Sequence, residues 1–192
     1  MKKIVGINAF LMMFSLIGLT SCSSDDNEVY FDMPVKLEDV NGDYSGKVVT
    51  SQGEAKNEGN IAFVVGDSII SFDELPVNEI IGSVIEDKEA AKAAIEALGK
   101  VEYDLNFTSN LNESSTAVEL AFEPEVLEVV VPVEGGEKKI VATFKTEHKG
   151  VYTSNRVNSL KFEIIVDKIT VDGVDLNPYE VIKYSFPLSI KK

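Results

Sequence analysis

Apolar and polar residues alternate along most of the chain after residue 40, a pattern typical of β-strands with one buried face. The clearest example is the stretch 101–108, in which Val101, Tyr103, Leu105 and Phe107 share one face and polar residues occupy the other. We expect further strands at 44–51, 61–65, 70–72, 118–122, 126–133, 140–144, 160–171 and 184–190. The chain is therefore predicted to be mainly β, with about nine strands.

The spacing of apolar residues changes to that of a helix between residues 76 and 98. Pro76 suits the first turn of one short helix. Asp87 is a favourable N-cap for a second helix over 88–98, and Gly99 is a typical stop. The pattern predicts a two-helix insertion within the strands.

Three positions predict irregular strands. Pro132 cannot donate to a strand ladder, so it indicates an edge strand or a bulge. The apolar phase of the strand 160–171 changes from even to odd positions near Asp167, which predicts a β-bulge there. Gly46, inside the first strand, favours a sharp bend of the kind a barrel needs.

Two expectations concern chain reversal and the last strand. Gly66 and Asp67 form a two-residue hairpin signal. In the last strand, the even-numbered residues form one apolar face that we expect to point inward: Tyr184, Phe186, Leu188 and Ile190.

Short turns between the strands favour antiparallel pairing, and about nine strands favour closure into a β-barrel or a two-sheet sandwich. No fixed-period repeat is present, so residues 39–192 are predicted to form a single β-rich domain. The opening Asn41–Gly46 resembles the start of lipocalin-like barrels, in which a glycine and an aromatic residue lead the first strand.

Residues 1–21 have the features of a secretory signal peptide. Lys2 and Lys3 precede an almost uncharged run, Ile4 to Leu19, which is shorter than the roughly 20 residues that a membrane-spanning helix needs. A cleaved signal is therefore favoured over a retained membrane helix.

The residues Leu19, Thr20, Ser21 and Cys22 resemble the lipobox of bacterial lipoproteins. That resemblance implies cleavage before Cys22 and acylation of its thiol, and two or more acyl chains give stable membrane attachment. The following Ser23, Ser24, Asp25 and Asp26 resemble the acidic export signal of surface lipoproteins in Bacteroidota. Residues 22–38 are thus predicted to be a flexible acidic tether. The alternative for the acidic run is a plain solvated linker.

As a whole, the chain resembles uncharacterised lipoproteins of gut Bacteroidota that carry domains of unknown function. The resemblance implies a protein anchored to the outer membrane by lipid and exposed on the cell surface. It implies no catalytic residues.

The charge and composition exclude several classes of function. With 32 acidic against 18 basic residues, the formal net charge is −14, which disfavours binding to nucleic acid. One cysteine and one histidine exclude an internal disulfide and the usual zinc sites. We therefore expect no cofactor, no metal and no catalytic activity.

A few residues remain as candidates for chemistry. Ser68, in Asp67-Ser68-Ile69, resembles an O-glycosylation acceptor of exported Bacteroidota proteins. The clusters around Asp39 and Asp172 contain oxygen ligands suited to calcium, but aspartate and glycine are also what hairpins require. His148 and Arg156 are expected to be solvated surface residues.

Two functions are consistent with these observations. The first is a non-catalytic binding or accessory module with a small apolar ligand in its barrel, for which a cavity should open at one end. The second is a structural or protein-interaction lipoprotein of a surface complex, for which an exposed apolar patch is expected. A glycan-binding accessory role is less favoured, and a hydrolase is disfavoured by the absence of a nucleophile-elbow pattern.

Overall fold

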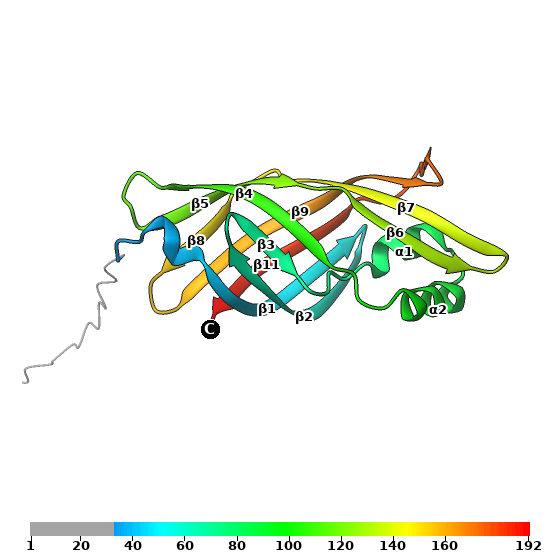
Figure 1. Cartoon of the computed structure of the whole chain (residues 1–192), viewed down its shortest axis with the longest axis horizontal. Coiled ribbons are helices and arrows are strands. Elements are labelled where there is room, and N and C mark those ends of the chain that lie inside the picture. The colour runs from blue at the N-terminus through cyan, green and yellow to red at the C-terminus, as the bar shows by residue number, and fades with distance from the viewer. Residues whose placement is uncertain (1–32) are drawn as a thin grey trace, which may run out of the picture. The chain divides into compact units, whose positions relative to one another are not determined.

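A computed structural model describes residues 33–192, in which antiparallel strands predominate (Figure 1). The mainly β expectation is therefore confirmed. The elements in chain order are η1 (Leu37–Val40), β1 (Gly42–Gln52), β2 (Ala55–Gly66), β3 (Ile69–Phe72), α1 (Asn78–Val84), α2 (Lys88–Leu98), β4 (Tyr103–Leu111), β5 (Ala117–Pro124), β6 (Leu127–Val133), β7 (Gly136–Lys145), β8 (Gly150–Ser154), β9 (Asn158–Val171), β10 (Val174–Asp175) and β11 (Ile182–Lys191).

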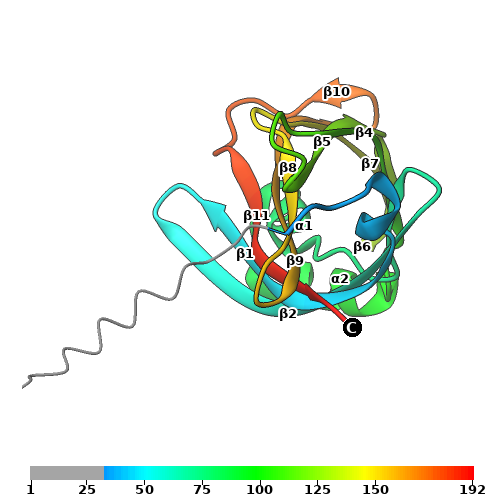
Figure 2. The ribbon, with the colours of Figure 1, turned by 90° about the vertical axis from the view of Figure 1, so that its left-hand side faces the viewer.

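The strands close into a barrel, which Figure 1 shows from the side and Figure 2 shows from one end. The order is β11-β1-β2-β3-β4-β5-β8-β9, and β11 also pairs with β9, which closes the ring. β6 pairs with β7, and β7 continues the ladder along β9 beyond β8. Every pairing is antiparallel, and the ring closes on itself, so this is a closed barrel rather than a sandwich. Strands next to each other in the ring mostly follow one another in the chain; the exception is β5 beside β8, where the β6–β7 hairpin intervenes.

The two-helix insertion is confirmed between β3 and β4. The Asp87 carboxylate accepts a hydrogen bond from the backbone N–H of Ala90 at 2.8 Å, so it is the N-cap of α2. Gly99 follows the helix with φ +71°, a conformation that favours glycine. The sequence pattern therefore predicted both ends of α2.

Two predicted strand irregularities are confirmed. Thr143 pairs with Lys168 but Phe144 pairs with Val166, which leaves Asp167 as the extra residue of a bulge. Pro132 lies in β6, which pairs only with β7 and is an edge strand.

The β2–β3 hairpin is shifted by one residue from the prediction. Asp67 and Ser68 are the residues with positive φ, at +51° and +64°, whereas Gly66 ends β2. The positive φ at both central positions is what a type I′ turn requires, and aspartate tolerates this conformation better than most residues. The hairpin thus forms without glycine at either central position.

The prediction for the last strand is half wrong. Tyr184 and Phe186 point inward and are fully buried, but Leu188 and Ile190 are 49% and 42% exposed. A bulge between Phe186 and Ser189 shifts the register by one residue, which exchanges the two faces of the strand. Ser189 therefore takes the buried position, and its hydroxyl has no hydrogen-bond partner among the described residues.

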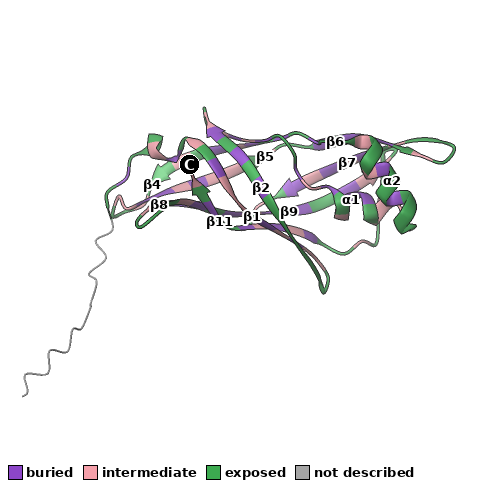
Figure 3. Ribbon diagram, turned by 90° about the horizontal axis from the view of Figure 1, so that it is seen from below, coloured by how far each residue is buried: buried purple, intermediate pink, exposed green. Residues whose placement is uncertain are grey.

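Aromatic rings fill the interior of the barrel. Phe162 and Phe186 stack with centroids 4.2 Å apart, and Phe63 stacks on Tyr44 at 5.3 Å. Phe72 bridges to Phe63 and Phe186 at 5.3 and 5.6 Å. Figure 3 shows the resulting alternation of buried and exposed positions along the strands.

Each end of the barrel is covered. At the end we call the η1 end, Val35 donates its N–H to the Ser115 carbonyl, and Tyr44 donates its hydroxyl to the Val40 carbonyl. At the opposite end, which we call the helix end, Ile80 and Ile81 of α1 are fully buried. The η1 end also holds the turns 67–68, 112–116 and 155–157, whereas the helix end holds the loops 53–54, 73–102, 134–135 and 172–181.

Candidate interaction surface

The barrel interior provides little room for a ligand. Tyr44, Tyr184 and Phe186 have no accessible surface, so no space as large as a water molecule adjoins them. Most of the other buried positions carry apolar side chains that belong to one continuous core. Four surface pockets of the described residues are lined mainly by residues of the outer wall and of the loops. A binding site is therefore expected on the outer surface.

The helix end carries an apolar groove of about 580 Å³ between α2 and the β6–β7 hairpin. One side is formed by three alanines of α2, and the other by the strand end and turn of the hairpin. The groove is lined by Ile85, Ala90, Ala93, Ala97, Pro132, Val133, Glu134 and Lys138. We call it the α2 groove.

The sequence of α2 explains how the groove forms. Ala91 and Ala94 are buried and fix the helix against the barrel, with Ile95 and Leu98 packed beside them. Ala90, Ala93 and Ala97 recur at helical spacing on an adjacent, exposed flank. Because alanine is small, this flank leaves open space between the helix and the hairpin.

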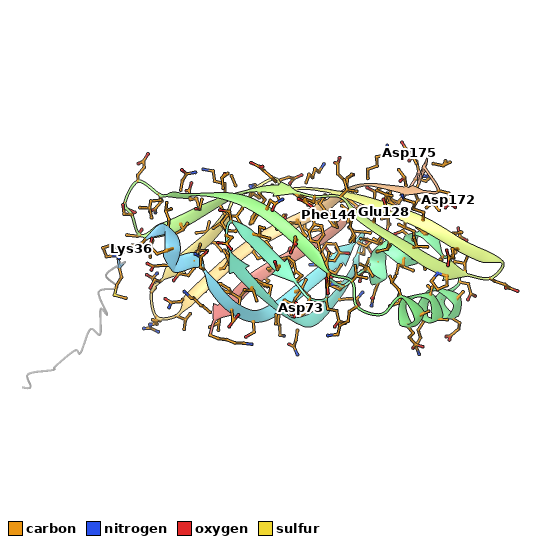
Figure 4. All side chains as sticks on the ribbon, viewed as in Figure 1. Lys36, Asp73, Glu128, Phe144, Asp172 and Asp175 are labelled. Carbon is orange, nitrogen blue, oxygen red and sulfur yellow. The ribbon has the colours of Figure 1, made fainter. Side chains whose placement is uncertain are left out.

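Charge is distributed unevenly between the two ends of the barrel. The loops and helices of the helix end contain 13 acidic and 3 basic side chains, a net charge of −10. The segments of the η1 end, 33–41, the three turns and residue 192, contain 4 acidic and 3 basic side chains, a net charge of −1. Figure 4 marks Asp172 and Asp175 toward the helix end and Lys36 at the other. The α2 groove therefore lies in a strongly negative region.

Ser68 lies at the exposed tip of the β2–β3 hairpin, at the η1 end. Its carbonyl accepts a hydrogen bond from the Phe107 N–H at 2.9 Å, which fixes the turn against β4. The side chain is accessible in this position. Glycosylation of Ser68 stays a prediction.

The two aspartate-rich turns use their carboxylates in local contacts. Asp39 accepts a hydrogen bond from the Lys36 N–H, and Asp172 accepts one from the Lys139 N–H. Asp175 pairs with Lys168 at 2.7 Å. Within residues 33–192, no three histidine, cysteine or acidic side chains form a group able to hold a metal. The contacts fit the role of turn residues.

The remaining candidates lie apart from the groove. His148 is exposed in the bend between β7 and β8, and Arg156 is exposed in the β8–β9 turn. The lipobox-like residues Leu19 to Cys22, where an anchor is predicted, and the acidic run Ser23 to Asp26 lie outside the described residues.

Buried tyrosines keep their protons. Burial raises the pKa of Tyr184, and the nearby Glu79 carboxylate raises it further. Burial also raises the pKa of Tyr44 and Tyr103. The neutral hydroxyls of Tyr44 and Tyr103 donate hydrogen bonds to the carbonyls of Val40 and Glu125, at 2.7 and 2.9 Å. These groups stabilise the barrel and are sealed from substrates, so they are poor candidates for catalysis.

The fold and surface define a closed antiparallel β-barrel protein of eight main strands with a helical insertion between two of them. The chain belongs to the family described as Domain of unknown function (DUF4840), whose model matches residues 39–171. That match ends with β9, yet β11 closes the barrel by pairing with β1 and β9, so the folded unit extends beyond it. No curated protein and no solved structure matches the chain. In the part of the chain from residue 33 onward, no helix is long and apolar enough to cross a membrane.

Proposed function

We propose that the protein is a lipid-anchored lipoprotein of the bacterial cell surface that acts without catalysis, as an interaction module of a surface complex. The observation that carries the interaction role is the filled barrel, covered at both ends, beside an exposed apolar groove. The lone cysteine in a lipobox-like context supports the anchor, and the acidic run after it supports export to the surface.

The filled interior favours a protein partner over a small ligand held in the barrel. A ligand of ordinary size needs a pocket of roughly 300–1,000 Å³ that encloses most of its surface, whereas the interior positions are occupied by stacked rings. The α2 groove is open to solvent, and its surroundings carry a net charge of −10. A partner that presents apolar residues ringed by lysine and arginine fits this chemistry best.

The anchor is tested by Cys22→Ala. Because the thiol is the atom that would be acylated, we expect the variant to lose incorporation of a labelled fatty acid and to leave the outer-membrane fraction. Asn27→Ala, a change of similar size in the same segment, serves as the control and should keep both. Fatty-acid labelling of Cys22→Ala equal to that of the unaltered chain would refute the anchor.

Surface exposure is measured separately, by protease added to intact cells. The double variant Asp25→Ala/Asp26→Ala should keep the lipid but become protected. Full protection of the unaltered chain would leave the anchor standing and refute surface display.

The interaction surface is tested by Ala93→Arg, which places a long cationic side chain in the α2 groove. When intact cells are treated with a cross-linker, the unaltered protein should form a discrete adduct with its partner. We expect Ala93→Arg to abolish this adduct, since the new side chain fills the groove and repels a basic partner. Val174→Arg is the matched control, because it adds the same charge at the same end on a 70% exposed side chain outside the groove. If both variants keep the adduct, the groove is not the contact surface.

A further inference from the structure

Large apolar side chains are exposed on the outer wall of the barrel toward the η1 end. Val64, Leu188 and Ile190 are 48%, 49% and 42% exposed, and Ala62 and Pro187 lie exposed beside them. We call these five residues the wall patch. Four of them, all but Val64, line an apolar groove of about 710 Å³.

The strand register makes the wall patch continuous. Ser45 of β1 pairs with Ala62 on one side and with Ile190 on the other, so these three residues form a row across β2, β1 and β11. Asp43 pairs with Val64 one step further toward the η1 end. The patch thus extends over three neighbouring strands.

The bulge in β11 creates this surface. It turns Leu188 and Ile190 outward and places the small Ser189 inside. Gly46 lines the same groove, and the β11 backbone at Leu188 and Ser189 occupies the space that a side chain at Gly46 would need. Two large apolar side chains therefore lie on the outer wall, where about half of their surface stays in contact with water.

Other exposed apolar side chains lie near the patch's end of the barrel. Met33 and Leu37 are 53% and 42% exposed at the start of the described chain, Leu111 is 40% exposed at the end of β4, and Val157 is 46% exposed in the β8–β9 turn. This end has a net charge close to zero, and Lys191 and Lys192 end the chain here. The helix end, by contrast, has a net charge of −10, which anionic lipid repels.

The position of the anchor points the same end toward the membrane. Only ten residues separate Cys22 from Met33, and even fully extended this link spans less than about 40 Å. The η1 end, where the described chain begins, must therefore stay close to a bilayer that holds Cys22.

We propose that the wall patch and the apolar residues of the η1 end rest on the lipid surface, so that the barrel lies against the membrane. This inference rests on the proposed lipid anchor. The occupant of the wall patch is the interface of the bilayer, where apolar side chains are buried among the acyl chains and lysines remain at the headgroups.

The chain contains no tryptophan, so a single introduced one reports on its own position. We would place the lipidated full chain on vesicles of phosphatidylethanolamine and phosphatidylglycerol that contain brominated acyl chains, which quench tryptophan on contact. The test variant is Leu188→Trp, in the wall patch. The matched control is Val174→Trp, an exposed valine at the helix end.

We expect the emission of Leu188→Trp to shift to the blue and to lose most of its intensity on brominated vesicles, while Val174→Trp changes little. Vesicle flotation of the same samples separates the two proposals. If the protein floats and Leu188→Trp is not quenched, the docking is refuted and the anchor stands. A blue shift without quenching, with or without vesicles, indicates a protein contact at the wall patch and also refutes the docking. If the protein does not float, the anchor fails, and with it the orientation derived from it.

Discussion

Replacing Phe186 with alanine is expected to destabilise the barrel by about 3–5 kcal/mol, the usual cost of removing a buried phenylalanine side chain. Phe186 has no accessible surface and stacks on Phe162 with an interplanar angle of 11°. Phe63 and Phe72 also contact the ring, at centroid distances of 6.3 and 5.6 Å. The void would lie at the centre of a closed barrel, where the surrounding strands have little freedom to collapse into it.

Urea unfolding of the purified protein, followed by circular dichroism, measures this loss. Leu188→Ala is the matched control: it truncates a large apolar side chain two residues away, but one that is 49% exposed, so we expect less than about 1 kcal/mol. A small loss for Phe186→Ala would mean that the interior is loosely filled. That result would revive an interior ligand and weaken the interaction role proposed above.

The sequence predicted those features that are encoded by local pattern. Asp87 and Gly99 marked the ends of α2, because a capping carboxylate and a left-handed glycine act on the nearest turn of the chain. The bulge at Asp167 was also readable, because the apolar positions around it change from even to odd. In each case the cause and its effect lie within a few residues.

The bulge in β11 was missed for a complementary reason. Leu188 and Ile190 continue the apolar alternation of Tyr184 and Phe186, so the sequence shows no change at the point where the inward and outward faces of the strand are exchanged. Only Pro187, which cannot donate to a strand ladder, signals a break there. The sequence does not distinguish a barrel from a sandwich, because the pairing of β11 with β1 that closes the barrel joins residues at opposite ends of the domain.

The candidate surface has a weaker signal in the sequence than the proposed anchor. A lipobox is a contiguous motif that an enzyme reads along the chain, so four residues suffice to suggest it. The α2 groove joins a helix to a hairpin more than 30 residues later in the chain. Its one sequence signal was the recurrence of alanine at positions 90, 93 and 97, beyond the buried stripe that the helical pattern predicted.

Gly46→Ala is expected to have the second large effect, although it adds only one methyl group. A Cβ at this position would collide with the Leu188 carbonyl oxygen and stand 2.9 Å from the Cα of Ser189, and both obstacles are backbone. Overpacking typically costs about 1–3 kcal/mol, and a backbone obstacle has no rotamer by which to relax. Because this clash would fall on the bulged segment of β11, we also expect weaker vesicle quenching of Leu188→Trp in the Gly46→Ala background.

Gly59→Ala separates this clash from the general effect of replacing a strand glycine. Gly59 lies in β2, opposite Val48 of β1, and a Cβ there would meet only a Val48 methyl at an ordinary 3.7 Å. We expect Gly59→Ala to be neutral or to stabilise by less than about 1 kcal/mol, since alanine restricts the unfolded chain. Equal unfolding free energies for the two variants would show that β11 can move away from β1. The bulge would then be a soft feature of the barrel, and the outward position of Leu188 and Ile190 would need another cause.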